Sequence, residues 1–360
     1  MKVLSLFSGI GAFEKALDNM GVGYELAAYC EIDKYASKSY AAIHGVCESL
    51  NLGDITKVDE KALPHDLDLV TYGFPCQDIS IAGQQKGLID EEGKQTRSGL
   101  FFEALRIIQE TQPRVAIAEN VKNLTGAKFR TQFELVLKSL EEAGYNNYWK
   151  VLNLKDFGIP QNRERVFIVS IRKDIDNGLF FFPAGFPLTL RMKDLLETEV
   201  DEKYYLSEKM VEYVTATVEG CGFGGDIDPE IARTLNATMT KMHRAGVDNY
   251  VSDVCIQAAN LNHYQNDQMN RVYSPEGISP TVLTKTGGGR ETKILPDNRR
   301  IRKLTPKECF RLMGFSDQDH AKAAEVNSNT QLYRQAGNSI GVPCVEYILM
   351  ALIDCGALAI

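Results

Sequence analysis

Two reactive side chains stand where short apolar stretches end. Cys76 follows the stretch 67–70, and Glu119 comes directly after the stretch 114–118. Such stretches predict buried parallel strands, whose carboxyl ends meet at one edge of a sheet. We therefore expect a thiol nucleophile and a carboxyl group to share one pocket. Pro75 fixes the backbone beside Cys76, which favours a thiol held on a stiff turn, although a free cysteine is more often simply buried.

A second group of residues predicts a nucleoside site. The strand expected at 2–7 runs through the Gly9–Gly11 turn into a helix that begins near Glu14, so bare N–H groups meet a helix N-terminus. The next strand, expected at 24–30, ends in Glu31, from where a carboxylate reaches ribose hydroxyls in doubly wound sheets. Glu14 replaces the third glycine of the dinucleotide fingerprint, so we expect a ligand with a neutral or positive group there instead of a pyrophosphate. 

Further polar residues are placed by the same pattern. Asp54 ends a third expected strand in the stretch 51–56 and suits the adenine side of the ligand, with a helix or turn cap as the alternative. Arg163 and Arg165 are two apart in an extended stretch and point to one side, which suits a planar or anionic group. A surface salt bridge with Glu164 is the alternative. The glycine-rich stretch 81–99 lacks periodicity and predicts a lid that closes over substrate.

Helix signals surround these candidates. Ser98 is expected to cap a helix at 99–110, and Thr305 to cap a helix within 304–313 that has Pro306 in its first turn. Further helices are expected at about 133–144 and at 344–352. Strands that alternate with helices along the chain are typical of an α/β fold.

Composition limits the class of protein. The chain has 360 residues, 44% hydrophobic and 24% charged, which is typical of a globular protein large enough for two domains. We expect a cytoplasmic protein without membrane attachment, because no apolar stretch reaches spanning length and the N-terminus resembles no signal peptide. Eight cysteines without C-x-x-C spacing predict reduced thiols and no metal site.

Charge gives a mixed signal about nucleic acid. The net charge of −8 argues weakly against such a partner. The segment 285–307, however, holds eight basic residues against two acidic ones, among them Arg300 and Lys303. Such a run of basic residues is usually a solvent-exposed surface, and the more specific interpretation is that it contacts a phosphate backbone.

Six stretches, in this order, resemble the motifs of the DNA (cytosine-5)-methyltransferases: Phe7-Ser8-Gly9-Ile10-Gly11, Gly73-Phe74-Pro75-Cys76-Gln77, Glu119-Asn120-Val121, Gln161-Asn162-Arg163-Glu164-Arg165, Arg302-Lys303-Leu304-Thr305-Pro306-Lys307-Glu308 and Gln335-Ala336-Gly337-Asn338-Ser339. The resemblance leaves about 174–273 poorly matched. It implies a Rossmann-like α/β domain that binds S-adenosyl-L-methionine, formed by 1–185 plus 331–360. It also implies a smaller, mostly β or irregular target-recognition domain at 186–330.

The resemblance implies roles for individual residues. Cys76 would add to C6 of a flipped-out cytosine, because C5 is too poor a nucleophile until that addition makes it an enamine carbon. Glu119 would hydrogen-bond N3 and the exocyclic amine, a role for a carboxyl kept protonated by burial. Arg163 and Arg165 complete the catalytic set, with Arg165 near the substrate.

Two sets of binding residues follow. Those expected at the cofactor are Phe7, Ser8, Gly9, Gly11, Glu31, Ile32, Asp54, Ile55, Pro75, Asn338 and Ser339. Those expected at DNA are Ser80, Gln84, Asn262, Gln265, Gly287, Gly288, Arg290, Arg300 and Lys303. Amide side chains and arginine pair with adenine and guanine in the major groove, and consecutive glycines permit close approach.

The resemblance implies double-stranded DNA as substrate, modified at one specific sequence by a monomer. Restriction-modification, with a separate cognate endonuclease, or phage self-protection is the expected setting. Three alternatives remain at this point: a tRNA cytosine methyltransferase with the same catalytic residues, a nicotinamide-dependent oxidoreductase with a similar glycine turn, and a non-catalytic DNA-binding module.

Overall fold

Two compact units make up the chain. The computed structural model describes residues 1–75, 88, 96, 98–207, 229–235, 237, 249–254, 257–260, 271–273, 293–294 and 299–359. The first unit comprises Met1–Arg191, Thr234–Thr240 and Cys309–Ile360, and the second comprises Met192–Arg233 and Lys241–Glu308. The first unit thus takes in 309–330, which we expected in the second domain, because α8 (Asp317–Val326) packs against α2 (Lys34–His44).

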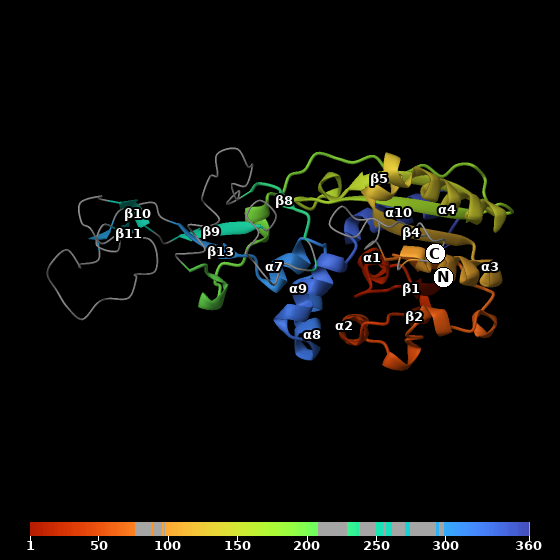
Figure 1. Cartoon of the computed structure of the whole chain (residues 1–360), viewed down its shortest axis with the longest axis horizontal. Coiled ribbons are helices and arrows are strands. Elements are labelled where there is room, and N and C mark those ends of the chain that lie inside the picture. Colours follow the sequence, from red (N-terminus) through yellow and green to blue (C-terminus); the bar gives the residue numbers. More distant parts are fainter. Residues whose placement is uncertain are drawn as a thin grey trace. The chain divides into compact units, whose positions relative to one another are not determined.

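A six-stranded sheet forms the centre of the first unit, with the strand order β2-β1-β3-β4-β7-β5 (Figure 1). The first four strands are parallel, and β7 runs antiparallel to both β4 and β5. Their bounds are β1 Lys2–Leu6, β2 Glu25–Cys30, β3 Leu69–Tyr72, β4 Val115–Val121, β5 Tyr145–Asn153 and β7 Glu164–Arg172, with a short β6 at Gln161–Asn162. The predicted α/β class is confirmed.

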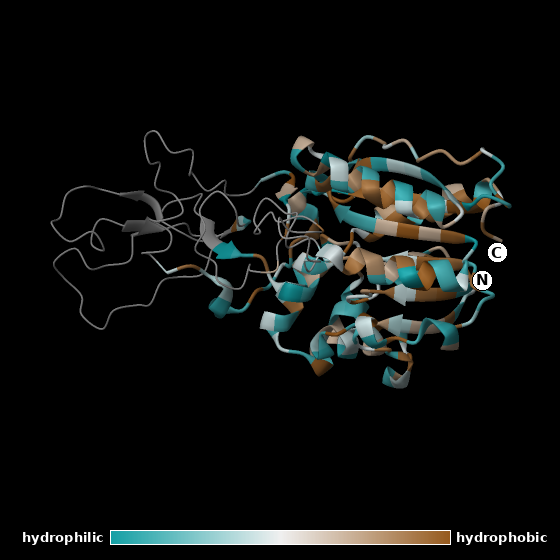
Figure 2. Ribbon diagram, turned by 45° about the vertical axis from the view of Figure 1, so that its right-hand side comes forward, coloured by the Kyte–Doolittle hydropathy of each residue, from teal (hydrophilic) through white to brown (hydrophobic). Residues whose placement is uncertain are grey.

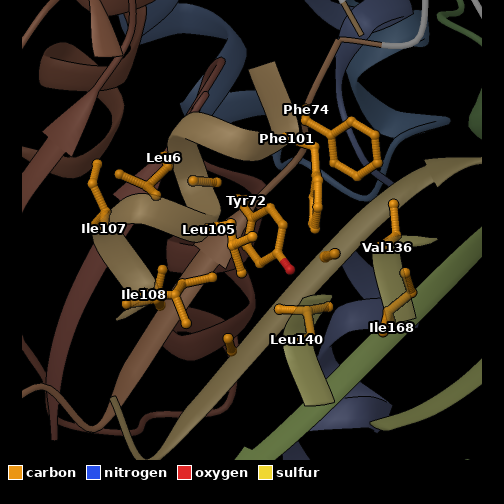
Figure 3. Close-up of a cluster of buried hydrophobic side chains, with 14 of the residues drawn as sticks. Leu6, Tyr72, Phe74, Phe101, Leu105, Ile107, Ile108, Val136, Leu140 and Ile168 are labelled. Carbon is orange, nitrogen blue, oxygen red and sulfur yellow. The ribbon is translucent and has the colours of Figure 1, made fainter. Parts of the chain in front are cut away.

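One face of this sheet is covered by α3 (Phe101–Thr111) and α4 (Arg130–Glu142). Their buried side chains meet alternate residues of the strands, such as Leu6 and Tyr72, in one continuous hydrophobic core (Figure 3). Burying apolar surface of this kind contributes about 25 cal/mol per Å² and is the main force that fixes the sheet. The strands are accordingly mostly hydrophobic in Figure 2, whereas the helices alternate between hydrophobic and hydrophilic residues.

The other helices of the first unit are α1 (Ala12–Asn19), α2, α8, α9 (Asn329–Asn338) and α10 (Val342–Asp354). Helix α10 packs against α1, and both α8 and α9 contact α2. Asp33 caps α2 by accepting from the Tyr35 N–H, and Ser316 begins α8 with a capping box. The C-terminal helices therefore close over the first βαβ segment of the chain.

Two N-cap residues were predicted, Ser98 and Thr305, and the first prediction is wrong. Helix α3 begins at Phe101 after a 3₁₀ turn that contains Ser98, and no side chain caps it. Thr305 does cap α7 (Pro306–Arg311), because its hydroxyl accepts from the Glu308 N–H and its own N–H donates to the Glu308 carboxylate. A local capping box is therefore readable from sequence, whereas the 3₁₀ entry of α3 is not.

The described part of the second unit contains 3₁₀ helices at Met192–Leu195 and Glu202–Tyr204 and six short strands: β8 Ala232–Arg233, β9 Tyr250–Val254, β10 Gln257–Asn260, β11 Arg271–Tyr273, β12 Lys293–Ile294 and β13 Arg299–Lys303. β13 pairs antiparallel with β9, and β11 lies between β10 and β12. Arg302 is only 1% exposed and binds the Glu308 carboxylate through two bonds of 2.9 and 2.8 Å. That bidentate pair compensates a buried charge and joins β13 to the start of α7.

Among the residues that the structure describes, no single helix is long and apolar enough to cross a membrane, although the bent pair of α9 and α10 meets that test of length and composition together.

Candidate active site

Glu119 lies near the carboxyl end of β4, beside the antiparallel strand that carries Arg165. The Arg165 Nε lies 3.0 Å from Glu119 Oε1, and both side chains are largely buried. Burial raises the pKa of the Glu119 carboxyl above its usual range, and the guanidinium groups of Arg165 and Arg163 oppose that rise. Glu119 is therefore a carboxyl group with a raised pKa that lies next to the cation of Arg165.

The segment that leads to Cys76 lies directly beside this carboxyl. A Cβ atom built on Gly73 would stand 3.8 Å from Glu119 Oε2 and 3.4 Å from Ile340 Cδ1. Asn120 Nδ2 donates to the Phe74 carbonyl at 3.0 Å, so the end of β4 holds the turn that follows β3. Pro75 is the last described residue of that turn. Cys76, Ser80, Gln84 and most of the predicted lid lie outside the described residues.

Arg163 takes a different position from Arg165. Its guanidinium is buried and donates to three backbone carbonyls, from Nη1 to Leu235 at 2.9 Å and from Nη2 to Gly337 at 3.1 Å and Ser339 at 2.6 Å. Arg163 therefore has different hydrogen-bond partners from Arg165, although the guanidinium groups of both oppose the rise in the pKa of the Glu119 carboxyl. These contacts support a positioning role for Arg163.

The turn after β1 has an unusual backbone. Phe7, Gly9 and Gly11 all have positive φ angles, of 53°, 58° and 80°. For phenylalanine such a conformation costs about 1–2 kcal/mol, and strain of this kind clusters at ligand sites. The Gly9 N–H donates to Glu31 Oε2 at 2.8 Å, and the Ser8 N–H donates to the Cys30 carbonyl at 3.1 Å. The turn and the end of β2 thus form one structure.

The end of β2 offers polar and apolar groups side by side. Glu31 Oε1 accepts from the Asp33 N–H at 2.7 Å. Burial raises the pKa of the Glu31 carboxyl, while the N–H groups of Asp33 and Gly9 oppose that rise. Ile32 is 74% exposed, an uncommon state for a large aliphatic side chain next to a sheet edge. A nucleoside whose ribose meets Glu31 and whose base covers Ile32 fits this pair.

The stretch 51–56 is not a strand of the sheet. Asn51 makes only an isolated bridge to Tyr29, and Asp54 caps a 3₁₀ helix, Ile55–Lys57, by accepting from the Thr56 N–H at 3.1 Å. The cap that we gave as the alternative for Asp54 is therefore present. Ile55 is buried in the core, so only its backbone is left to meet a ligand.

Asn338 and Ser339 end α9 in the same unit as the turn. Gln335 fixes this helix to α2, since its Nε2 donates to the Tyr35 carbonyl at 3.0 Å and its Oε1 accepts from Ser39 Oγ at 2.9 Å. Arg163 binds the carbonyls of Gly337 and Ser339, which follow Gln335 at the C-terminal end of this helix. The sequence analysis did not predict that Gln335 links α9 to α2. The only signal for Gln335 was its place in the stretch Gln335-Ala336-Gly337-Asn338-Ser339.

Glu14 does not face the ligand side of the turn, and that part of the sequence interpretation is wrong. Its side chain is fully buried, and neither carboxylate oxygen has a hydrogen-bond partner of normal geometry. Burial raises the pKa of the Glu14 carboxyl, and His44 opposes that rise. The missing third glycine thus says nothing about the charge of the ligand.

Apart from Ser80 and Gln84, the predicted DNA contacts belong to the second unit. Asn262, Gln265, Gly287, Gly288 and Arg290 lie outside the described residues, and of Arg300 only the backbone in β13 is described. Lys303 is partly buried, with its Nζ 5.4 Å from the centre of the Tyr204 ring, and Lys203 lies 5.2 Å from the same ring. Burial lowers the pKa of Lys303, as does the charge of Lys203. In the described part of the chain, no group of three or more acidic, histidine or cysteine side chains is arranged to hold a metal.

The sheet, with its strained turn after β1 and the Glu31 carboxylate at the end of β2, is typical of Rossmann-like enzymes that bind a nucleoside cofactor. The buried acid Glu119, close to the segment that leads to Cys76, is typical of a transferase active site. The chain belongs to the C-5 cytosine-specific DNA methylase family, whose model matches residues 1–354. It is therefore a DNA (cytosine-5-)-methyltransferase, as the motifs predicted, and enzymes of this family use S-adenosyl-L-methionine. The nicotinamide-dependent and non-catalytic alternatives are set aside.

Known relatives extend over nearly the whole chain. The orphan methyltransferase M.SPBetaI of Bacillus phage SPbeta is 34% identical, over 98% of this chain and 97% of that protein. The type II methyltransferase M.HhaI of Haemophilus parahaemolyticus is also 34% identical, over 97% of this chain and 93% of that protein. Among solved structures, the Entamoeba histolytica methyltransferase EhMeth has a TM-score of 0.68 at 17% identity, with 98% of both chains covered. S. pombe Dnmt2 has a TM-score of 0.61 at 20% identity and the same coverage. These two structures support the fold alone.

Proposed function

We propose that this chain methylates C5 of a flipped-out cytosine within one specific duplex DNA sequence, with Cys76 as the nucleophile. The observation that carries the proposal is the position of Glu119. Its carboxyl is buried, has a raised pKa, contacts Arg165 and lies beside Gly73, three residues before Cys76. This position supports a buried acid close to the Cys76 nucleophile, an arrangement that the addition chemistry requires.

The steps follow from these groups. The Cys76 thiolate adds to C6 of the cytosine, and Glu119 gives a proton to N3 as negative charge enters the ring, so that C5 becomes an enamine carbon. Arg165 keeps the Glu119 carboxyl oriented and stabilises it once the proton has left. When bound, S-adenosyl-L-methionine would supply an electrophilic methyl group to C5 and leave as S-adenosyl-L-homocysteine. Loss of the C5 proton to a base then expels the Cys76 thiolate, and return of the N3 proton to the Glu119 carboxylate restores the neutral aromatic ring and the acid.

The cofactor site proposed for this chain combines the turn after β1 with the ends of β2 and α9. Gly9 and Gly11 leave the backbone open, Glu31 accepts from ribose hydroxyls, and the exposed face of Ile32 takes the adenine. The residue types fit a nucleoside, because Glu31 offers a carboxylate to hydroxyl groups and Ile32 is an apolar side chain that is 74% exposed. Phe7, Ser8, Asp54, Pro75 and the Asn338–Ser339 segment complete the set, and Ile55 joins it through its backbone.

The second unit is proposed to read the DNA sequence, with β13 supplying Arg300 and Lys303 to phosphates. We further propose that the enzyme acts as a monomer in the cytoplasm of a bacterium or a phage-infected host. Restriction-modification or self-protection of a phage is the proposed setting, with any restriction endonuclease acting as a separate protein. The orphan and type II names of the phage and bacterial relatives support this setting.

The test is to incubate the purified protein with S-adenosyl-L-methionine and unmethylated plasmid, and then to map modified cytosines at base resolution. 5-Methylcytosine at one recurring sequence is the expected result, and Cys76→Ala should yield none. If tRNA is modified and the plasmid is not, the protein is a cytosine methyltransferase whose substrate is RNA instead of DNA. Failure with both substrates would refute the proposal.

A further inference from the structure

His44, the last residue of α2, lies under the cofactor turn. Its side chain is 1% exposed. The Nε2 atom lies 3.1 Å from the Ile10 carbonyl oxygen, and the Nδ1 atom lies 3.2 Å from Asp18 Oδ2. A carbonyl and a carboxylate only accept hydrogen bonds, and a neutral imidazole has one N–H. Both contacts are hydrogen bonds at the same time only when the ring carries two protons.

The contact with the turn is close. A Cβ atom on Gly11 would stand 2.1 Å from His44 Nε2 and 2.9 Å from the Tyr40 ring, so the imidazole occupies the place where any other residue would put its side chain. The turn is thus bound at two successive residues. The Gly9 N–H donates to Glu31, and the Ile10 carbonyl accepts from His44. 

The charges around the ring favour a cation. Asp18 of α1 is 42% exposed and binds Nδ1, while Glu14 of the same helix is buried within electrostatic reach. Burial raises the pKa of the Glu14 carboxyl, and His44 is the largest influence that opposes this rise. The remaining titratable groups near the cluster are Tyr40 of α2 and Tyr24 before β2, both with pKa values raised by burial. From α8, Lys322 Nζ donates to the Ile43 carbonyl at 2.8 Å.

We propose that His44 is a positioning residue for the cofactor: held as an imidazolium by Asp18, it fixes the Ile10 carbonyl and thereby the backbone of the Gly9–Gly11 turn. The inference rests on the proposed cofactor site and adds to it a support that touches no part of the ligand. Loss of one of the two ring protons would leave either the Ile10 carbonyl or Asp18 without its hydrogen bond.

The protonation state is tested directly in the full-length protein. The chain has five histidines, so ¹⁵N-imidazole NMR spectra of wild type and His44→Gln identify the His44 signals by difference. Two protonated ring nitrogens at neutral pH are expected. A neutral tautomer, with one bare nitrogen, would overturn the inference, since one of the two contacts would then not be a hydrogen bond.

The effect on the cofactor is measured by calorimetric titration with S-adenosyl-L-methionine. His44→Gln should raise the dissociation constant about tenfold, because a bond from a charged donor is lost, with little change in kcat at saturating cofactor. Asp18→Asn keeps the size of the side chain but removes the counter-ion. It should weaken binding roughly two- to fivefold.

His65→Gln is the matched control. His65 is exposed, and its Nδ1 lies 3.1 Å from the Glu110 carbonyl oxygen, away from the turn after β1. This variant should bind the cofactor like wild type. If wild type itself does not bind S-adenosyl-L-methionine, the proposed function fails. If wild type binds and both Asp18→Asn and His44→Gln bind equally well, the role of His44 is refuted; should His44→Gln not fold, Asp18→Asn and the wild-type NMR spectrum decide.

Discussion

Replacing Arg163 by methionine tests whether this arginine is part of the architecture rather than of the chemistry. Methionine keeps much of the length and loses every donor. Three carbonyls, those of Leu235, Gly337 and Ser339, would lose a charged partner. Each buried acceptor left unpaired costs about 1–3 kcal/mol, and because the three share one guanidinium the losses do not add fully, so we expect about 3–5 kcal/mol in total.

In the Arg163→Met variant, local opening of the segment that ends α9 costs less free energy than unfolding of the whole protein. The segment can move so that water reaches its carbonyls, and the free energy of that local opening then limits the loss of global stability. Arg163→Met should therefore lower the midpoint of denaturant unfolding and weaken binding of S-adenosyl-L-methionine by about a hundredfold, which corresponds to about 2.7 kcal/mol. Hydrogen exchange should rise most at residues 335–340.

Arg165→Met is the control for this experiment. Arg165 makes one ion pair, with Glu119, and one bond to the Glu164 carbonyl, and neither touches the end of α9. We expect a large loss of methylation rate, near-normal cofactor affinity and a small change in stability, because Glu119 can take up a proton when its cation is removed. Equal stability and equal cofactor affinity for Arg163→Met and wild type would refute the reasoning.

Three other outcomes are expected. Cys76→Ala should abolish methylation while duplex DNA binding, measured by fluorescence anisotropy, stays largely intact; retained turnover would exclude Cys76 as nucleophile. Arg165→Met removes a cation that lowers the pKa of Glu119, so the acid form should persist to higher pH and the alkaline limb of kcat/KM should move upward. An unmoved or lowered limb would contradict this coupling. Arg300→Ala and Lys303→Ala should weaken binding about equally for all DNA sequences and reduce its dependence on salt by about one phosphate contact each. Loss of affinity for one sequence only would instead indicate base reading.

The sheet and the edge that carries the site were predictable from sequence. Short apolar stretches before Cys76 and Glu119 correspond to β3 and β4, which are parallel neighbours. The order of residues along the chain then brings Gly73, three residues before Cys76, beside the Glu119 carboxyl. This success has a physical reason, since buried parallel strands need continuous apolar runs and their ends need polar groups.

What the sequence did not reveal are side-chain partners that are distant along the chain. Arg163 donates to carbonyls that lie 72, 174 and 176 residues away. Glu14 was expected at the ligand, but its place in α1 directs it into the interior toward His44. A spacing of residues gives the face of a helix or strand, not the element that will cover it. No local pattern in the sequence contains that information.

The way in which the C-terminal helices close over α1 and α2 bears on how the protein is made. Asn19 Nδ2 donates to Glu346 Oε1 across 327 residues of chain, and α10 packs against α1. During synthesis the first strands emerge from the ribosome long before the helices that cover them. The apolar side of α1 must therefore wait while the whole second unit is translated, and contacts of such long range form late. We expect the growing chain to be a substrate for chaperones during this interval, and a message truncated before α9 to yield a product that aggregates.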